Sequence, residues 1–353
     1  MTAPLRSLWT EMLDVAAMAA TPLVPSSYIE LVAPLAATHV RYARIEALRH
    51  EAGGAVTLTL RPGRGWTTHR AGQFVKVGVE VDGRILTRTY SISSAPEERG
   101  GCFTITVKAI GKVSNALAKA KVGSYLFVDR PQGEFVLPEE TPAKLLFVTG
   151  GSGITTVASM LRSLRTRVEP FDVVHVHYVP KSGDMICGVE LRRFAMENPA
   201  YRLVIVAVEE GGKLLDASEL ARMVPDHAER EAWACGPESL LDAAVTHVGE
   251  RTHVERFRPK LAPIDPNARG GKVRFGRSKK EVEAQAQTPI LDVALAAGVD
   301  APHGCRIGIC HSCDATLKSG CVRDLRTGAL VSEEGARIQP CVCAAAGDVD
   351  VDL

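Results

Sequence analysis

The sequence lacks a long hydrophobic run, an excess of charge of one sign, and enough cysteine for a framework of disulfide bonds. No stretch of the 353 residues reaches the roughly 18 to 20 consecutive apolar residues that a membrane-spanning helix needs. The 42 Lys and Arg residues balance the 41 Asp and Glu residues, so no net field draws the chain toward nucleic acid or an anionic membrane. Nine cysteines are few for a disulfide scaffold of this length. We therefore predict a soluble protein of about two to three domains that binds no nucleic acid.

The first 139 residues show two hydrophobic patterns. In the N-terminal extension, residues 1–37, apolar side chains from Leu5 to Ala16 recur at helical spacing, which predicts a short amphipathic helix. We expect this helix to pack on the neighbouring domain, and the alternative is that it docks on a partner or a membrane. Residues 38–139 alternate short apolar runs with Gly, Pro and charged turns, which indicates an antiparallel β-barrel.

The pattern changes in the rest of the chain. Residues 140–257 alternate strand-like apolar runs with stretches of helical spacing, which is typical of a parallel sheet with helices on both faces. The predicted helices cover residues 154–167, 185–197, 216–224 and 238–249. Residues 258–270 are rich in proline and lack periodicity, as a semi-rigid linker does. The last predicted domain, residues 271–353, is small for a stable core unless something staples it.

The spacing of the cysteines in the last domain indicates what stabilises it. Cys305, Cys310 and Cys313 have the C-x4-C-x2-C spacing of a plant-type [2Fe-2S] site, and a fourth cysteine follows at Cys341 or Cys343. Four thiolates are needed to hold the two irons of such a cluster. A zinc ribbon would instead show paired C-x2-C knuckles. The residues therefore predict a [2Fe-2S] cluster and leave the choice of the fourth ligand open.

A glycine-rich turn in the segment L-L-F-V-T-G-G-S-G-I-T predicts a dinucleotide site. Gly150, Gly151 and Gly153 join a predicted strand to a helix, which lets a pyrophosphate approach the backbone amides at the helix N-terminus. Lys181, after the next strand, favours the 2′-phosphate of NADPH, whereas the glutamates at 209–210 favour NADH. NADPH and NADH therefore stay open as alternatives.

Two further features lie on predicted strands of the same domain. Cys235, followed by Gly236 and Pro237, ends a strand at the sheet edge where such folds bind ligands, which makes it a site candidate; buried packing is the alternative. His175 and His177 alternate on one strand. Because no third ligand lies near them in the sequence, we interpret them as sheet residues rather than as a metal-binding pair.

The barrel, the nucleotide-binding pattern and the cluster spacing, in this order, resemble the ferredoxin-NADP reductase superfamily in its form with a C-terminal ferredoxin domain. The resemblance covers residues 38–353. It implies an antiparallel β-barrel FAD domain, an α/β parallel-sheet NAD(P) domain and a β-grasp [2Fe-2S] ferredoxin domain. It also implies FAD rather than FMN, and an oxidoreductase that converts the hydride of NADPH or NADH into single electrons.

The motif R-x-Y-S marks the flavin site in that superfamily, and Arg88, Thr89, Tyr90 and Ser91 match it. By this resemblance Arg88 holds the flavin pyrophosphate and Tyr90 stacks on the isoalloxazine ring. Ser91 is implied to be catalytic, since it would hydrogen-bond near N5, the flavin atom that accepts hydride. Thr89 is assigned to the same cofactor site.

A second flavin element of the superfamily, G-x-V-S, matches Gly111, Val113 and Ser114. Its amides would neutralise the same pyrophosphate at the start of a helix. Lys108, a few residues before this element, is assigned to the cofactor site as well.

The nicotinamide motifs of the superfamily are also present. Thr155 ends the match to G-G-S-G-I-T at 150–155, but Thr156 stands where relatives carry proline. Cys235 in C-G-P is implied to be catalytic, because the equivalent cysteine of relatives sits beside nicotinamide C4. Phe257 resembles the aromatic residue that covers the second face of the flavin, and the alternative is that it belongs to the core.

A closer resemblance is to the reductase partners of bacterial acyl-CoA desaturases, which share the segment V-R-D-L-R-T-G at 322–328. In those relatives the fourth cluster ligand aligns with Cys341. The resemblance implies a cytoplasmic protein that donates electrons to a membrane-bound diiron acyl-CoA desaturase and reaches the membrane through that partner. The first alternative is the reductase of a soluble Rieske-type ring-hydroxylating oxygenase or another oxygenase. The second is a redox sensor, in which a complete nicotinamide site would be superfluous.

Overall fold

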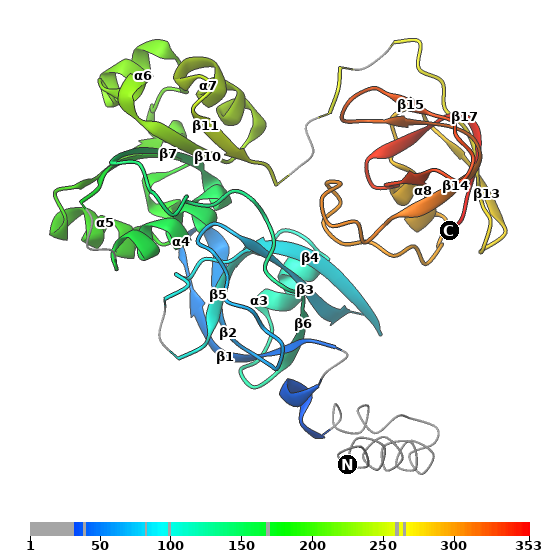
Figure 1. Cartoon of the computed structure of the whole chain (residues 1–353), viewed down its shortest axis with the longest axis horizontal. Coiled ribbons are helices and arrows are strands. Elements are labelled where there is room, and N and C mark those ends of the chain that lie inside the picture. The colour runs from blue at the N-terminus through cyan, green and yellow to red at the C-terminus, as the bar shows by residue number, and fades with distance from the viewer. Residues whose placement is uncertain are drawn as a thin grey trace, which may run out of the picture.

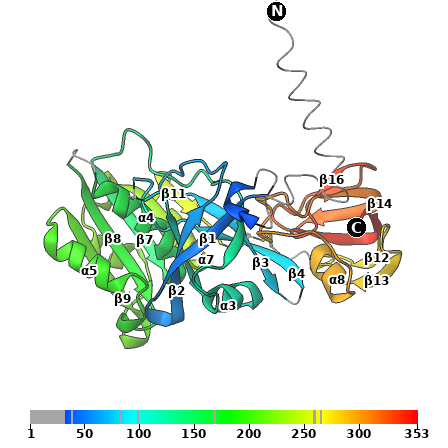
Figure 2. The same ribbon diagram turned by 90° about the horizontal axis from the view of Figure 1, so that it is seen from below.

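The computed structural model describes residues 32–37, 40–81, 83–97, 100–166, 170–257, 261–263 and 266–353. The described chain forms a β-barrel, a parallel-sheet domain and a C-terminal domain, with the barrel between the other two (Figure 1; Figure 2). The predicted amphipathic helix falls within residues 1–31, outside the described residues. Within the described ranges, no helix is both long and apolar enough to cross a membrane.

The barrel is a single antiparallel sheet with strand order β4-β3-β6-β1-β2-β5. Its strands are β1 (Tyr42–His50), β2 (Ala55–Pro62), β3 (Phe74–Val81), β4 (Arg84–Ser91), β5 (Phe103–Lys108) and β6 (Tyr125–Val128). A bridge between Ile92 and Ile105 joins the two edges of the sheet and closes it. Helix α3 (Lys112–Ala118) packs on the barrel interior through Val113 and Leu117. Short 3-10 turns lie at Pro34–Ala36 and Ala52–Gly54.

The second domain is a five-stranded parallel sheet with strand order β11-β10-β7-β8-β9. Its strands are β7 (Lys144–Gly150), β8 (Asp172–Val179), β9 (Tyr201–Ala207), β10 (Glu231–Cys235) and β11 (Thr252–Glu255). Its helices are α4 (Ile154–Leu164), α5 (Gly188–Glu197), α6 (Ala217–Met223) and α7 (Glu238–Val248), with 3-10 turns at Gly151–Gly153, Ser182–Asp184, Val208–Glu210 and His227–Glu229. The four helices predicted from the sequence are confirmed, each slightly shorter than its apolar pattern.

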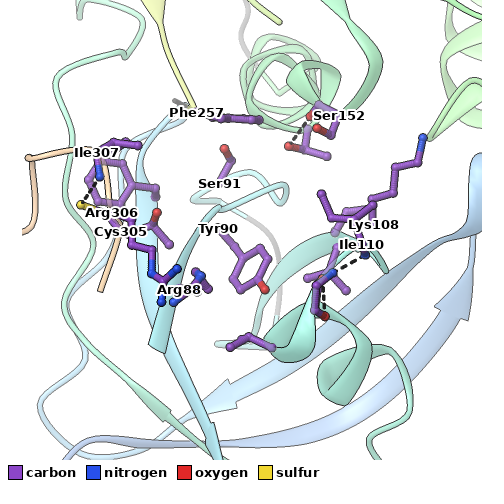
Figure 3. Close-up of a pocket in the computed structure, with 18 of the residues that line it drawn as sticks. Arg88, Tyr90, Ser91, Lys108, Ile110, Ser152, Phe257, Cys305, Arg306 and Ile307 are labelled. Atoms are coloured by element: carbon purple, nitrogen blue, oxygen red, sulfur yellow. Dashed lines mark hydrogen bonds between the residues drawn. The ribbon is translucent and has the colours of Figure 1, made fainter. Parts of the chain in front are cut away.

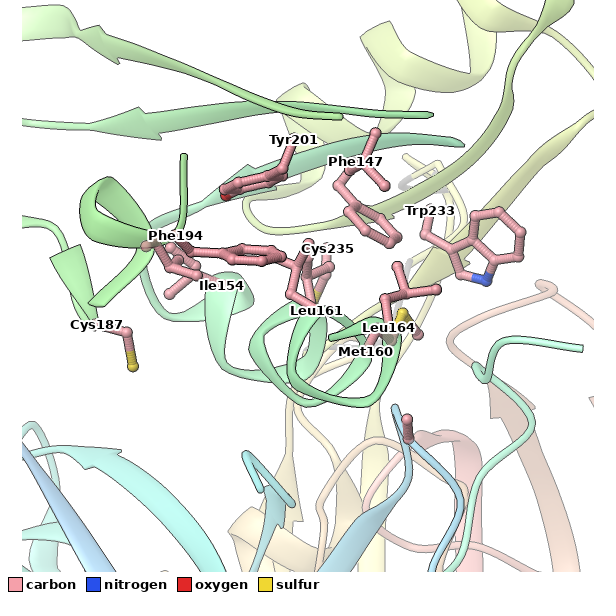
Figure 4. Close-up of a cluster of buried hydrophobic side chains, with 14 of the residues drawn as sticks. Phe147, Ile154, Met160, Leu161, Leu164, Cys187, Phe194, Tyr201, Trp233 and Cys235 are labelled. Atoms are coloured by element: carbon pink, nitrogen blue, oxygen red, sulfur yellow. The ribbon is translucent and has the colours of Figure 1, made fainter. Parts of the chain in front are cut away.

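Alternation along the strands gives the parallel sheet two buried faces. On β7, Leu145 and Phe147 point into a core shared with α4 and α5 (Figure 4), whereas Leu146 and Val148 point into the core beneath α6 and α7. The histidines of β8 lie on the first face: His175 Nε2 and His177 Nδ1 each lie 2.7 Å from Thr149 Oγ1. They are buried, hydrogen-bonded sheet residues, as the sequence indicates.

The C-terminal domain is a mixed sheet covered by one helix among its described residues. Its elements are β12 (Gly271–Phe275), β13 (Lys280–Ala284), α8 (Ile290–Ala296), β14 (Ala315–Asp324), β15 (Leu330–Val331), β16 (Arg337–Ile338) and β17 (Cys343–Val351). The first strand, β12, pairs parallel with the last, β17, and antiparallel with β13. This arrangement is the predicted β-grasp, so the fold class read from the sequence is confirmed for all three domains.

The turn before α4 packs directly on the turn after β10. A Cβ atom added to Gly153 would lie 2.0 Å from the carbonyl oxygen of Cys235, and one added to Gly150 would lie 2.6 Å from Cδ of Pro237. The obstacle at Gly153 is backbone, which cannot move without displacing β10. Glycine at 153 therefore sets the distance between the start of α4 and the end of β10.

We predict that Gly153→Ala lowers the melting temperature of the protein, because the added methyl group overpacks this contact at a cost of about 1 to 3 kcal/mol or more. Thermal unfolding of the purified proteins measures the effect. Gly183→Ala is the matched control, since a Cβ atom there would meet no atom within 4 Å. Equal melting temperatures for the two variants would contradict the close packing.

Candidate active site

A cavity of about 460 Å³ lies where the three domains meet (Figure 3). Its wall includes four stretches of the barrel and parallel-sheet domain, together with the cysteine loop of the C-terminal domain. The lining residues include Arg88, Thr89, Tyr90, Ser91, Lys108, Ile110, Gly111, Val113, Ser114, Ser152, Thr155, Glu255, Phe257, Cys305, Arg306 and Ile307. The flavin-type motifs of the barrel therefore share one cavity with a predicted cluster ligand.

Strand β4 delivers the R-x-Y-S motif to this cavity. The Arg88 guanidinium donates from Nη1 to the Thr87 carbonyl oxygen at 2.7 Å, and burial together with nearby Arg306 lowers the pKa of Arg88. Burial raises the pKa of Tyr90 to about 12, so its phenol stays neutral. Ser91 is buried, and its Oγ lies 2.8 Å from Oγ1 of Thr156 in α4. The motif thus combines a fixed cation, a neutral ring and a buried hydroxyl.

The start of α3 is held by its own serine. Ser114 Oγ accepts hydrogen bonds from the amides of Gly111 at 2.9 Å and Ile110 at 3.1 Å. Val113 is buried in the barrel core, whereas Lys108 is exposed at the end of β5. The serine therefore orders the turn that lines the cavity and engages two of its amides.

The three glycines of the nucleotide motif have different surroundings. Gly150 and Gly153 face protein atoms of residues 235–237, whereas a Cβ atom at Gly151 would meet nothing within 4 Å. Gly151 also has φ +52°, which favours glycine. Thr155 lines the cavity and donates from Oγ1 to the Ser152 carbonyl oxygen at 2.9 Å. Of the three glycines, Gly151 has open space beside it for a ligand.

Cys235 lies behind the cavity wall rather than in it. Its side chain is fully buried, and its Sγ lies 3.9 Å from Thr156 Oγ1. Burial, with a smaller effect of Glu255, raises the pKa of the Cys235 thiol, which keeps it neutral. Gly236 and Pro237 pack against Gly150. The structure therefore links Cys235 to Ser91 through one threonine hydroxyl.

Lys181 lies outside the cavity, where β8 ends. Its side chain is 64% exposed, and its Nζ is 3.9 Å from Oε2 of Glu209. Glu210 accepts hydrogen bonds from the amide and hydroxyl of Ser182. The cation that favours NADPH and the carboxylates that favour NADH thus lie side by side at one edge of the sheet.

Glu255 lines the cavity, although it was not predicted to be a site residue. It ends β11, pairs in register with Cys235, and comes two residues before the predicted aromatic, Phe257. Phe257 lines the cavity and is 40% exposed, so it is not a core residue. Burial raises the pKa of Glu255 to about 7. The available signal was its position at the carboxyl end of a parallel strand.

The structure brings the predicted cluster ligands together as two pairs. The thiols of Cys305 and Cys310 hydrogen-bond to each other, which lowers the pKa of Cys310 to about 4. Cys313 pairs in the same way with Cys341, which lowers the pKa of Cys313 to about 7. Cys343 begins β17, where burial raises its pKa to about 11.

This donor set fits a [2Fe-2S] cluster, in which each of two irons takes two thiolates. No group of three or more His, Cys, Asp or Glu side chains among the described residues forms a site for a single metal ion. Backbone amides already point at the sulfurs: Cys305 N donates to Cys310 Sγ at 3.1 Å, and Ile307 N donates to Cys305 Sγ at 3.4 Å. Such bonds stabilise charge on a cluster.

Direct contacts hold the cysteine loop on the barrel. Thr87 Oγ1 donates to the His303 carbonyl oxygen at 2.8 Å, and Lys76 Nζ donates to Ser312 Oγ at 3.1 Å. Arg306, at φ +61°, reaches the cavity beside Arg88. Arg306 was not predicted to line the cavity, since its contact with the region of Arg88 joins segments more than 200 residues apart.

We predict that Glu255→Gln changes how stability depends on pH. The folded-state pKa of about 7 exceeds the ordinary value of 4.5, so the stability that the neutral form contributes is present below about pH 4.5 and is lost as the pH rises through 7. The melting temperature of the unmodified protein should fall relative to that of the variant between about pH 5 and pH 8. Exposed Glu139→Gln is the control; a pH-independent difference for Glu255→Gln would contradict the burial of this carboxyl group.

Comparisons with known proteins agree with this geometry. Residues 57–137 match the family described as oxidoreductase FAD-binding domain, and residues 273–346 match the 2Fe-2S iron-sulfur cluster binding domain. The chain is 42% identical to an NADPH oxidoreductase of Mycobacterium tuberculosis over 98% of its own length and 93% of that protein. It is 31% identical to a glycine betaine monooxygenase reductase subunit of Pseudomonas aeruginosa, over 80% of this chain and 87% of the relative.

Among solved structures, phthalate dioxygenase reductase aligns with a TM-score of 0.63 and 25% identity, covering 88% of this chain and 97% of that one. That protein is described as a modular structure for electron transfer from pyridine nucleotides to [2Fe-2S]. Its domain content is the one built here from the barrel, the parallel sheet and the cysteine loop. The chain therefore belongs to the ferredoxin reductase-type oxidoreductases, electron-transfer enzymes that use NAD(P)H and join an FAD-binding domain to a C-terminal 2Fe-2S domain.

Proposed function

We propose that this protein is the NADPH-dependent reductase component of an oxygenase system, with FAD in the three-domain cavity and a [2Fe-2S] cluster beside it. The observation that carries the proposal is that Cys305 shares the wall of one cavity with the R-x-Y-S motif. A ligand in this cavity would contact the barrel and the cluster loop together. Short separation of the two redox groups is what an electron-transfer enzyme requires.

The residues of the barrel have distinct roles toward the flavin in this proposal. When bound, FAD accepts a hydride and the cluster carries one electron at a time, so the pair converts two-electron into one-electron chemistry. Arg88 would bind the pyrophosphate, helped by the ordered turn at Gly111 and by Lys108. Tyr90 and Phe257 would cover the two faces of the ring. Thr89, Val113 and Ser114 shape the remaining wall.

The parallel-sheet domain would hold the nucleotide. Gly151 offers the open approach to backbone amides, and Thr155 stands at the junction with the flavin cavity. Gly150, Gly153, Gly236 and Pro237 would act by fixing the two turns against each other. NADPH is our choice over NADH, supported by exposed Lys181 and by the name of the 42% identical relative.

Electron transfer from the cluster would depend on its four ligands. We propose Cys305, Cys310, Cys313 and Cys341, because these thiols occur as two hydrogen-bonded pairs.

We also propose the domain boundaries given above, 1–37, 38–139, 140–257, 258–270 and 271–353. A cytoplasmic location is part of the proposal, since reducing conditions keep these thiols available.

The comparisons change the order of the two acceptors inferred from the sequence. A curated relative and the aligned structure are named as reductases of a glycine betaine monooxygenase and of phthalate dioxygenase, and neither name mentions a desaturase. The desaturase inferred from residues 322–328 is therefore the second candidate rather than the first. Both acceptors are iron enzymes that would take electrons singly.

Coupled turnover with each acceptor tests the proposal. We expect NADPH-driven, product-forming turnover of a Rieske-type oxygenase component with this protein, and loss of product with Cys305→Ser, which removes a cluster ligand. Membranes that contain a diiron acyl-CoA desaturase form the second arm. Product in the membrane arm alone would replace the oxygenase by the desaturase, and failure to reduce even an artificial one-electron acceptor would overturn the reductase assignment itself.

The fourth cluster ligand has a separate test. We predict that Cys341→Ser loses the visible absorption and the iron content of the cluster, because Cys313 is left without its partner thiol. Cys343→Ser, two positions away and also buried, is the matched control and should retain both. Iron analysis and visible circular dichroism of the purified variants give the answer. Retention of the cluster by Cys341→Ser with loss by Cys343→Ser would reverse the assignment.

A further inference from the structure

Thr156 connects the two residues that the resemblance implies to be catalytic. Its Oγ1 lies 2.8 Å from Oγ of Ser91 on the flavin barrel and 3.9 Å from Sγ of Cys235 on the parallel sheet. The three side chains come from β4, α4 and β10, which are distant in the sequence. The hydroxyl of Thr156 is therefore the polar link between the flavin side and the nicotinamide side of the site.

Burial isolates this link from solvent. Thr156 and Cys235 are completely buried, and Ser91 is 7% exposed. Water cannot reach Thr156 or Cys235, so loss of the Thr156 hydroxyl leaves the buried thiol without this partner. The neutral thiol of Cys235 can both donate and accept a hydrogen bond. Each of the three groups can therefore act as a hydrogen-bond donor or as a hydrogen-bond acceptor.

Position 156 is also where this chain departs from the motif of its superfamily. By the resemblance given above, the superfamily motif has proline after G-I-T, where this chain has Thr156. Proline has no hydroxyl and no side-chain hydrogen bond to offer. Position 156 lies in the first turn of α4, where either residue is compatible with a helix. Helix formation alone thus does not account for threonine at this position. The hydroxyl of Thr156 is used in hydrogen bonds to Ser91 and Cys235.

The Ser91 hydroxyl must change from hydrogen-bond donor to acceptor when a flavin bound beside it is reduced. N5 of an oxidised flavin offers a lone pair, so the Ser91 hydroxyl must donate to it. N5 of a reduced flavin carries hydrogen, so the same oxygen must accept and its own proton must turn elsewhere. Each hydroxyl has only one proton. The hydrogen bonds among Ser91, Thr156 and Cys235 can therefore run in two opposite directions, which differ by rotation of O–H and S–H bonds without any net proton transfer.

We infer that Thr156 is a positioning residue that sets the direction of the Ser91 hydroxyl. In one setting Cys235 donates to Thr156 and Thr156 donates to Ser91, which leaves the Ser91 proton free for the flavin. In the other setting Ser91 donates to Thr156 and Thr156 donates to Cys235. The inference rests on the proposed function in one respect, namely that Ser91 contacts the flavin.

Hydride transfer in the holoenzyme tests the inference. Anaerobic stopped-flow mixing with NADPH measures flavin reduction without any acceptor protein. Thr156→Val keeps the shape and removes the hydroxyl, and we expect it to slow flavin reduction about 10-fold or more with little change in the NADPH concentration that gives half-saturation. Thr156→Ser restores the hydroxyl and should recover most of the rate. The midpoint potential of the bound flavin should move toward more negative values in Thr156→Val and return in Thr156→Ser.

Two further comparisons separate positioning from a structural effect. Thr156→Val combined with Ser91→Ala should be no slower than Ser91→Ala alone, because Thr156 acts through Ser91. Ser159→Ala is the matched control: it removes another buried hydroxyl of α4, which donates to the Ser94 carbonyl oxygen at 2.6 Å and contacts neither Ser91 nor Cys235. Its rate and potential should equal those of the unmodified protein.

The outcomes are distinguishable. An equal additional loss from Thr156→Val in the Ser91→Ala background, or failure of Thr156→Ser to restore rate and potential, would overturn the inference. An unaltered rate and potential in Thr156→Val would do so as well. If Ser91→Ala itself leaves flavin reduction unchanged, the proposed placement of Ser91 at the flavin fails, and the role of Thr156 fails with it.

Discussion

The contact between the β3–β4 hairpin of the barrel and the cysteine loop is the constraint on which the rest of this structure depends. Thr87 Oγ1 and Lys76 Nζ hold residues 303–312 against the flavin motif, and Cys305 thereby enters the wall of the cavity. Without that contact the barrel and the C-terminal domain would each keep their folds, since each has its own apolar core. The path for electrons between them would be lost, however, because transfer requires proximity of the two groups.

Exclusion of water where the domains meet also sets the protonation of the site. Desolvation is the largest cause of the raised pKa of Tyr90, of Cys235 and of Glu255. The phenol and the thiol are therefore neutral hydrogen-bonding groups, while the carboxyl group titrates near neutral pH. Arg88 keeps its charge, since guanidinium does not deprotonate in proteins. The lining consequently combines cationic side chains, Arg88, Arg306 and Lys108, with the neutral phenol of Tyr90, which suits an anionic, aromatic cofactor.

The assignment of the electron acceptor has a different basis from that of the electron path. The path is inferred from the cavity wall that the R-x-Y-S motif shares with Cys305 in this chain. The acceptor is inferred from relatives, and a fold can serve many acceptors once its redox groups are in place. Residues 322–328 pointed to a desaturase, whereas the named monooxygenase and dioxygenase reductases cover most of the chain and point to oxygenases. The reductase chemistry is common to both acceptors.

The sequence by itself determined those features of this protein that arise from residues close together in the chain. The C-x4-C-x2-C loop and the alternating strands and helices were predictable, because the ligand spacing and the side-chain periodicity depend on short stretches of backbone. The role of the R-x-Y-S motif came instead from the resemblance to a known superfamily. The spacing left Cys341 and Cys343 open and the resemblance pointed to Cys341, whereas the tertiary structure shows that Cys341 is the one that pairs with Cys313. Tertiary structure alone decided that Glu255 and Arg306 line the flavin cavity. It also placed Cys235 behind Thr156. These relations join residues far apart in the chain, and only the packing of whole domains brings such residues into contact.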